Sequence, residues 1–360
     1  MKPASLRPFL PRPALRRRQP QCPFRAYAIQ APGAAPTLQV FDSRIKQIHK
    51  ERAAANADSS RRVDYLRDEI ASRLCERLLD INRHFPSVLD LGANACNIAR
   101  ILTTTPPPTP TDPPLHTRLT SLTSADWSPT LLNRDAHLPF NAALPSHTRT
   151  VLTDPDTAPL PFAPHSFSAV LSSLSLHWIN DLPALLAQIA TVLKPDSPFL
   201  AAIFGGDSLF ELRTSLQLAD LDRRGGVATH VSPLADVRDV GGLLQKAGFK
   251  LLTVDVDDVV VEYPDTFALM QDLQAMGESN AALVRETNAG LRGLGRDVLL
   301  ANEAIYRELH GGGGERGGIP ATWRVIYMIG WTPGEGQPEP LARGSGDLNI
   351  KDILEGGAKK

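Results

Sequence analysis

The chain has 360 residues and a net charge of only −1, from 38 basic and 39 acidic residues, and 42% of its residues are hydrophobic. This length suits one large α/β domain with additions or two modest domains. No stretch approaches the roughly 18 consecutive apolar residues that span a membrane. Three scattered cysteines, Cys22, Cys75 and Cys96, exclude a disulfide framework and a thiolate zinc site. We therefore expect a soluble folded part in a reducing compartment.

The charges are sorted along the chain. No acidic residue precedes Asp42, whereas seven basic residues do: Lys2, Arg7, Arg12, Arg16, Arg17, Arg18 and Arg25. The remainder is acidic, which excludes broad nucleic-acid binding. Residues 1–36 are rich in arginine, proline and alanine, which is typical of a cleaved, disordered mitochondrial transit peptide. A basic arm that contacts nucleic acid or membrane is the alternative.

Hydrophobic periodicity predicts an alternation of strands and helices after a charged, N-terminal helical segment over 37–85. The stretch SVLDLGANACNIARIL, residues 87–102, indicates a buried strand to Gly92 and a helix from Asn94. Six further strands are predicted at 118–125, 149–153, 167–173, 199–204, 250–256 and 323–331. Further helices are predicted at 128–135, 182–193, 237–247, 266–276 and 298–309. This order predicts a doubly wound, mostly parallel seven-stranded sheet over 86–331.

Three irregular segments interrupt or follow this pattern. The string TTTPPPTPTDPP at 103–114 predicts a surface loop, because proline denies both helix and ladder hydrogen bonds; a docking role in polyproline conformation stays open. A helical insertion is expected over 257–322, with a flexible joint at the glycines of 311–314. A flexible tail is expected over 332–360.

Acidic residues stand at the ends of three strands that are predicted to be neighbours: Asp90 near the end of the first, Asp126 after the second and Asp154 after the third. The carboxyl ends of parallel strands meet above one ligand crevice. There Asp126 would accept hydrogen bonds from ribose hydroxyls and Asp154 from an adenine amine, while Asp90 and the backbone of Gly92 would face the amino-acid end of S-adenosylmethionine. Each acid taken alone is also explained as a turn or cap residue.

The glycine code of a dinucleotide site is only partly present after this first strand. Asn94 and Cys96 stand where further glycines would be expected after Gly92. An ordinary strand-to-helix corner is the simplest alternative. The lack of a complete phosphate cradle fits S-adenosylmethionine, which has no phosphate, better than a dinucleotide.

The middle of the chain, over roughly 85–206, resembles the class I S-adenosylmethionine-dependent methyltransferase fold. The resemblance rests on LDLGANACNIARIL, SADWSPTLL, LTDPDTAPLPF and FLAAIFGG. The longer strings SSLSLHWINDLP, FGGDSLFELRTSLQLAD, LQAMGESNAA and YMIGW resemble the mitochondrial complex I assembly factor 5 family of arginine hydroxylases. With DYLRDEIASRL upstream, this second resemblance covers most of 41–331.

The resemblance implies a cofactor, a substrate and a location. S-adenosyl-L-methionine would be held by Asp90, Gly92, Asn94, Asp126, Trp127, Asp154 and Ser173. An arginine of a complex I subunit would be the protein substrate. The protein would lie in the mitochondrial matrix or be peripheral to the inner membrane. The family pattern favours glycines at positions 94 and 96, so Asn94 and Cys96 bear on cofactor affinity.

His177 and Asp207 are the candidate catalytic residues, since they follow the fourth and fifth predicted strands. His177 would act as a base or orient a guanidinium group, and Asp207 or Glu211 would pair with a substrate arginine in bidentate fashion. The alternatives are that His177 and Trp178 cap the core and that Asp207 caps the following helix. We find no two-His, one-carboxylate spacing typical of an oxygen-activating iron site, so no metal ligands are predicted.

Two other functions stay open at this point. One is methyl transfer to a carboxylate or acyl-carrier substrate, which also suits this fold. The other is a catalytically silent assembly chaperone, which the missing glycines favour and the three retained acids oppose.

Overall fold

The computed structural model describes residues 38–105, 114–144, 146–154, 156–283, 294–312 and 317–338. The predicted transit peptide, most of the proline-rich segment, part of the glycine joint and residues 339–360 of the predicted tail lie outside these ranges.

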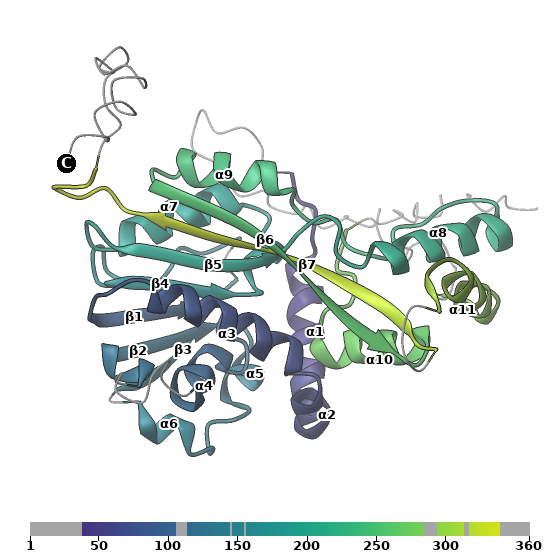
Figure 1. The fold of residues 1–360 in the computed structure, drawn as a ribbon, viewed down its shortest axis with the longest axis horizontal. Helices are drawn as coiled ribbons and strands as arrows, with labels where there is room; N and C mark the ends of the chain where they lie inside the picture. The colour runs from purple at the N-terminus through teal and green to yellow at the C-terminus, as the bar shows by residue number, and fades with distance from the viewer. Residues whose placement is uncertain are drawn as a thin grey trace, which may run out of the picture. The chain divides into compact units, whose positions relative to one another are not determined.

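The core is a seven-stranded sheet with the strand order β3-β2-β1-β4-β5-β7-β6 (Figure 1). The first five strands in this order are parallel, and β7 runs antiparallel to both β5 and β6. The predicted doubly wound, mostly parallel sheet is thereby confirmed. The strands are β1 (Phe85–Leu91), β2 (Leu119–Asp126), β3 (His147–Val151), β4 (Ala169–Ser173), β5 (Pro198–Phe204), β6 (Lys250–Tyr263) and β7 (Ile319–Trp331).

Helices cover both faces of this sheet. Side chains of α3 and α4 pack in one apolar cluster, and those of α7 and α9 pack in another on the opposite face (Figure 1). Strands β4 and β5 are buried along their whole length, as expected for parallel strands covered on both sides. The helices are α1 (Ser43–Ala55), α2 (Ala57–Arg62), α3 (Tyr65–Leu79), α4 (Asn97–Thr104), α5 (Pro129–Asn133), α6 (Phe140–Ala143), α7 (Leu182–Val192), α8 (Phe210–Arg224), α9 (Val237–Lys246), α10 (Thr266–Met276) and α11 (Arg296–His310), with short 3₁₀ turns η1 (Leu115–Arg118) and η2 (Leu176–Trp178).

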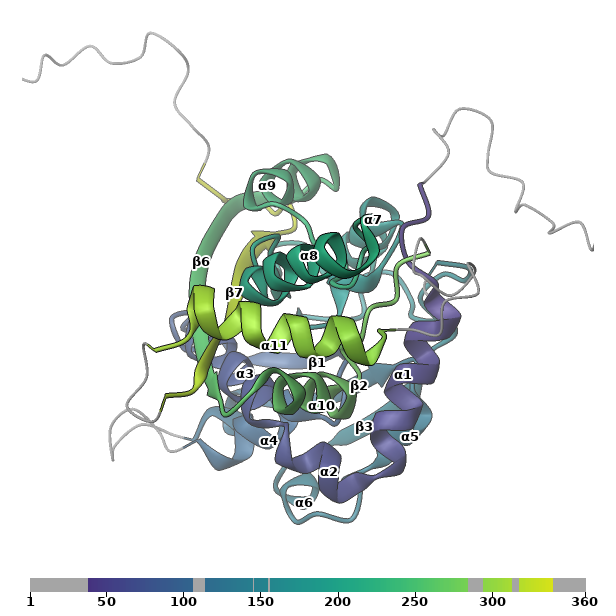
Figure 2. The same cartoon turned by 90° about the vertical axis from the view of Figure 1, so that its right-hand side faces the viewer.

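Helix α1 lies beside the carboxyl ends of the parallel strands, on the side where α8, α10 and α11 gather (Figure 2). Its contacts reach the residues that follow β2 and β3: Lys50 pairs with Asp126, and Ser43 donates a hydrogen bond to Asp154. The edge of the sheet at which a ligand is expected is therefore covered by the first helix of the described chain.

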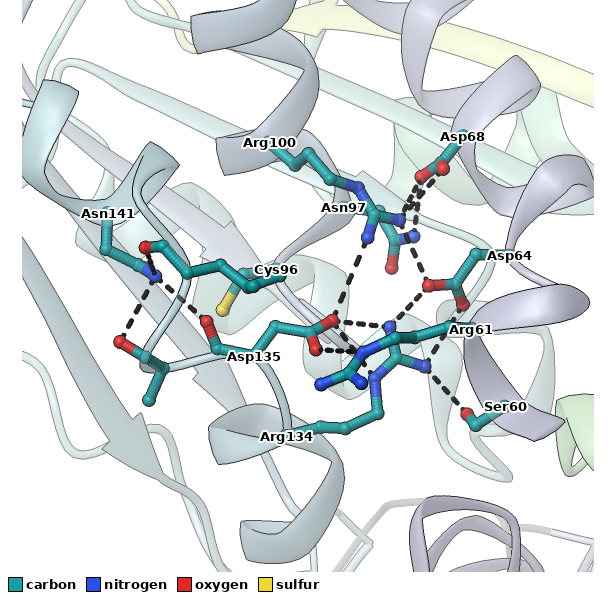
Figure 3. A network of polar contacts seen from close by, with 12 residues as sticks. Ser60, Arg61, Asp64, Asp68, Cys96, Asn97, Arg100, Arg134, Asp135 and Asn141 are labelled. Atoms are coloured by element: carbon teal, nitrogen blue, oxygen red, sulfur yellow. Dashed lines mark hydrogen bonds and ion pairs between the residues drawn. The ribbon is translucent and has the colours of Figure 1, made fainter. Parts of the chain in front are cut away.

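A network of buried charges fastens α2 and α3 to α4 and α5 (Figure 3). Arg134 pairs with Asp64 and Asp135, and its Nη1 donates to Ser60 Oγ at 2.7 Å. Arg100 of α4 pairs with Asp68 of α3 at 2.6 Å. Each of these guanidinium groups has acidic partners, and breaking such buried pairs is costly. We therefore regard the network as structural.

Strands β6 and β7 extend well beyond the prediction, so the helical insertion predicted over 257–322 is shorter than expected. Strand β6 continues to Tyr263, and β7 begins at Ile319. The acids that interrupt the apolar pattern of β6 have partners: Asp255 pairs with Arg77, Asp257 with Arg73, and Asp258 with Arg324. These pairs let a strand rich in acids continue.

Smaller differences occur at element ends. Strand β3 ends at Val151 rather than at residue 153, and α4 begins at Asn97 rather than at Asn94. The predicted flexible tail is anchored at its start: Thr332 Oγ1 donates to the carbonyl of Lys194 at 2.6 Å, and Gln337 Nε2 donates to Asp196 at 2.8 Å. Residues 332–338 therefore pack against the connection between α7 and β5.

Candidate functional site

The turn after β1 has an unusual backbone. Gly92, Asn94 and Cys96 all have positive φ, at 73°, 51° and 58°. Position 92 admits only glycine without rearrangement, since an added Cβ would lie 2.1 Å from Ser175 Oγ. A side chain in the left-handed region costs roughly 1–2 kcal/mol, and asparagine tolerates it better than most residues. The turn thus keeps a glycine-like conformation at two positions that are not glycine, which delays the start of α4.

Hydrogen bonds from Asn94 offset part of this strain. Its backbone N–H donates to Asp126 Oδ2 at 2.9 Å, and its Nδ2 donates to the carbonyls of Gly92 and Ser173, both at 3.1 Å. Cys96 is buried, and burial raises the pKa of its thiol to about 11. Asn94 therefore joins the ends of β1, β2 and β4, while Cys96 acts as an inert apolar side chain.

Asp126, at the end of β2, is completely buried and well supplied with donors. Lys50 Nζ lies 2.8 and 3.0 Å from its two oxygens, and the backbone N–H of Ser128 donates to Oδ1 at 2.8 Å. The Lys50 ammonium also lies 4.5 Å from the centre of the Trp127 ring. In this structure the Lys50 ammonium therefore occupies the position that was predicted for the ribose hydroxyls.

Asp90 is also completely buried, but neither of its oxygens has a hydrogen-bond partner among the described residues. Burial, together with the nearby charge of Asp126, raises the pKa of Asp90 well above its ordinary value. Leaving a buried polar group unsatisfied costs about 1–3 kcal/mol. Such a group at the carboxyl end of β1 is characteristic of a ligand site rather than of a structural corner.

The two remaining predicted cofactor residues border the same edge. Asp154 accepts a hydrogen bond from Ser43 Oγ at 2.6 Å and another from the N–H of Asp156 at 3.0 Å. Ser173 ends β4, and its buried hydroxyl has no partner among the described residues. The fold brings Asp90, Asp126, Asn94 and Ser173 together, and α1 links Asp154 to them.

A second buried cluster, which the sequence did not predict, surrounds Glu278 after α10. Its Oε2 accepts from Lys46 Nζ at 2.9 Å and from Trp178 Nε1 at 2.8 Å, and its Oε1 accepts from Arg67 at 3.1 Å. Although burial raises the pKa of Glu278, the nearby charges of Lys46 and Arg67 lower it below its ordinary value overall. Glu278 is therefore a fixed anion between α1, α3 and η2.

Lys46 completes this cluster. Besides Glu278, its ammonium donates to the carbonyl of Gly277 at 2.8 Å and lies 3.6 Å from the centre of the Trp178 ring. Burial lowers the pKa of Lys46 to about 7, against the opposing effect of Glu278. The ammonium is held by three groups but loses its proton far more easily than a lysine in water.

His177, one of the two candidate catalytic residues, lies beside Glu278. Its Nε2 is 3.6 Å from Glu278 Oε2, which is beyond hydrogen-bond distance, and neither ring nitrogen has a hydrogen bond among the described residues. The ring contacts Phe204, with centroids 5.0 Å apart. Burial lowers the pKa of His177, which keeps the imidazole neutral at physiological pH.

The other candidates, Asp207 and Glu211, have partners on β7. Asp207 is largely exposed and pairs with Arg324. Glu211 is buried and accepts hydrogen bonds from the hydroxyl and N–H of Thr322. The alternative that Asp207 caps α8 is wrong, because Leu209 is the cap and makes no side-chain cap bond. The bonds of both acids brace α8 against the sheet.

A cavity of about 330 Å³ lies next to the Glu278 cluster, between α8 and α10. Its walls are mostly apolar and come from Leu209, Leu212, Leu216, Met270 and Leu273. Its polar lining includes Glu278, Asn280 and His230, whose Nε2 is 2.6 Å from the buried carboxylate of Asp220. The cavity is therefore mostly apolar, and its lining includes the buried charge of Glu278.

Comparison with known proteins identifies the family. A "Methyltransferase domain" model matches residues 63–254. "Arginine-hydroxylase NDUFAF5, mitochondrial" of Danio rerio is 43% identical over 316 residues, which cover 88% of this chain and 90% of the relative. The protein of the same name from Homo sapiens is 42% identical over 317 residues, which cover 84% of that relative. This chain belongs to the NDUFAF5 arginine-hydroxylase family.

The predicted family, its methyltransferase fold and its mitochondrial location are thereby confirmed. A more distant relative is "Malonyl-[acyl-carrier protein] O-methyltransferase" of Laribacter hongkongensis, which is 34% identical to this NDUFAF5 family member over 309 residues. The matched residues cover 85% of this chain and 92% of the relative. Among the described residues, no helix combines the length and apolar character that a membrane span requires.

Proposed function

We propose that this protein binds S-adenosyl-L-methionine at the carboxyl edge of its sheet and hydroxylates an arginine of a complex I subunit in mitochondria. The observation that carries the cofactor proposal is the unsatisfied, buried Asp90 beside Asp126. Identity of 43% to a named arginine hydroxylase over most of both chains supports the reaction. The proposed location is the matrix, with peripheral association at the inner membrane.

The residues of the crevice fit the cofactor group by group. Asp90 and the Gly92–Asn94 turn would hold the amino-acid end, with the Asp90 carboxyl and the Ser173 hydroxyl as the groups that still need partners. Asp126 and Asp154 would hold the ribose and the adenine amine, and Trp127 would border the sugar. When bound, S-adenosylmethionine supplies an activated methyl group on a sulfonium centre.

Helix α1 must yield for this binding to occur. Lys50 holds Asp126, and Ser43 holds Asp154, so both acids that would bind the nucleoside already have partners on α1. The structure therefore corresponds to a closed arrangement of α1 over the edge.

The residues that would act on the substrate arginine lie next to this edge. The imidazole of His177 can accept a hydrogen bond from a guanidinium group, and Glu278 lies 3.6 Å away. Hydroxylation also needs an oxidant. Among the described residues no group of three His, Cys, Asp or Glu side chains is arranged to hold a metal ion. We therefore propose no metal site for the activation of an oxidant.

Methyl transfer to a carboxylate on an acyl carrier is the second candidate. It is supported by the 34% identical malonyl-carrier methyltransferase, which the chain covers to 92%. The cations Lys46 and Arg67 would suit a carboxylate substrate.

The two reactions are separated by the mass that they add. The complex I subunit purified from cells that contain this protein should carry one additional oxygen, compared with the subunit from cells that lack it. One additional methylene would instead support methyl transfer.

A further inference from the structure

We propose that Glu278, Trp178 and the carbonyl of Gly277 form the binding site for the guanidinium group of the substrate arginine, and that Lys46 of α1 occupies this site in the closed structure. The inference rests on the proposed function, because it gives the arginine of that reaction a place in the fold.

The surroundings of Lys46 form a built cation site. Its ammonium lies between a carboxylate oxygen at 2.9 Å, a backbone carbonyl at 2.8 Å and an indole ring at 3.6 Å. These are the groups that bind guanidinium well, since it stacks flat on aromatic rings and presents five N–H donors to carboxylate and carbonyl oxygens. An ammonium offers three donors and no flat face, so a guanidinium group would use this site more completely.

His177 is an independent sign of a missing ligand beside this site. Its side chain is completely buried, and both ring nitrogens lack hydrogen bonds among the described residues. Buried imidazoles normally have at least one partner. A guanidinium group in place of the Lys46 ammonium has spare N–H donors, one of which can reach the His177 nitrogen next to Glu278.

The cavity between α8 and α10 provides a route to this site. Glu278 is part of its lining, and the apolar walls of Leu212, Leu216 and Leu273 suit the three methylenes of an arginine side chain. Helices α8 and α10 lie on the same side of the molecule as α1 (Figure 2). The substrate would thus reach Glu278 through the cavity and the cofactor would reach Asp90 through the crevice, with α1 bordering both.

Exchange of Lys46 for a substrate arginine puts a group that is always charged in place of a lysine whose pKa is lowered to about 7. Arg67 stays bonded to Glu278, so the carboxylate retains one cation throughout.

The test measures how the full-length protein binds a peptide that carries the target arginine, compared with the same peptide carrying citrulline. We expect Glu278→Gln and Trp178→Leu to weaken binding of the arginine peptide at least about tenfold, because a charge-assisted contact is lost. Lys46→Met should strengthen it several-fold, because the competing ammonium is gone. The control Glu303→Gln removes a carboxylate between α10 and α11 and should leave binding of the arginine peptide unchanged.

The inference would be overturned if Glu278→Gln and Trp178→Leu bound the arginine peptide as tightly as the wild type does. It would also be overturned if Lys46→Met bound the peptide more weakly than the wild type. Lys46→Met keeps the bonds of Glu278 to Arg67 and Trp178, so its result stands even where Glu278→Gln fails to fold. The stabilisation of each variant by S-adenosylhomocysteine should equal that of wild type, which separates substrate loss from cofactor loss. A wild-type protein that prefers arginine to citrulline but adds no oxygen would support this site and refute the proposed reaction.

Discussion

Lys46 and Lys50 lie one turn apart on α1, and each places its ammonium between a carboxylate and an indole ring. Lys46 contacts Glu278 and Trp178, while Lys50 contacts Asp126 and Trp127. Residues four apart share one face of a helix. A single helix face therefore covers both the proposed cofactor site and the proposed arginine site.

Removing the Lys50 ammonium should strengthen cofactor binding. In Lys50→Met the carboxylate of Asp126 keeps its backbone donors but loses its competing cation, so ribose hydroxyls bind without displacing a salt bridge. We expect a several-fold lower Kd for S-adenosylhomocysteine by calorimetry. Arg52→Met, an exposed change on the same helix, is the control. Weaker binding by Lys50→Met would mean that Lys50 supports the ligand instead of opposing it.

Removing the Asp126 carboxylate should abolish cofactor binding and destabilise the fold. Asp126→Ala leaves the Lys50 ammonium buried without its partner, which costs about 3–5 kcal/mol in the free energy of unfolding. The variant should show no rise in melting temperature with S-adenosylmethionine. Adding Lys50→Met should restore most of the stability but none of the cofactor response. A preserved cofactor response in Asp126→Ala would remove this residue from the site.

The free energy of unfolding should fall as the pH rises, because of the buried Asp90. Its pKa is raised in the folded state, so folding favours the protonated form, and this stabilisation is lost as pH increases above the ordinary carboxyl range. Asp90→Asn cannot ionise and should therefore be more stable than wild type at pH 7.5. The difference should shrink towards pH 5 in denaturant titrations, and cofactor binding should weaken. A pH-independent difference would show that Asp90 is charged in the folded protein.

The backbone at position 94 should prefer glycine to alanine. Asn94→Ala keeps a side chain at positive φ and loses the bonds to Gly92 and Ser173, so we expect a loss of about 2 kcal/mol in the free energy of unfolding. Asn94→Gly loses the same bonds but relieves the strain, and it should lose about 1 kcal/mol less. Equal losses in thermal or denaturant unfolding would show that the turn is not strained.

The sheet, and the acids at the carboxyl ends of β1 and β2, could be predicted because they depend on local patterns. Short apolar runs ended by Asp90 and Asp126 indicate buried strands, and the bounds of α10 follow from its own periodicity. The extension of β6 was not predicted, because three acids interrupt its pattern and their arginine partners lie far away in the sequence.

The contacts of α1 could likewise not be predicted from local patterns, because their partners lie far away in the sequence. Lys46 and Glu278 are 232 residues apart, and Lys50 and Asp126 are 76 apart. A signal did exist in the sequence. Lys46 and Lys50 share a helix face with the buried Ala53, and lysines on a buried face require acidic partners. The string that contains Glu278 was noticed only as a family resemblance, which did not reveal its role.

The proposed reaction of this chain is the addition of oxygen to an arginine of a complex I subunit. Tandem mass spectrometry of that subunit, purified from cells with and without the protein, tests it most directly. We expect one additional oxygen on a single arginine, which is present with the wild-type protein and absent with Asp126→Ala. An unmodified arginine in both samples, or one additional methylene on any residue, would contradict it.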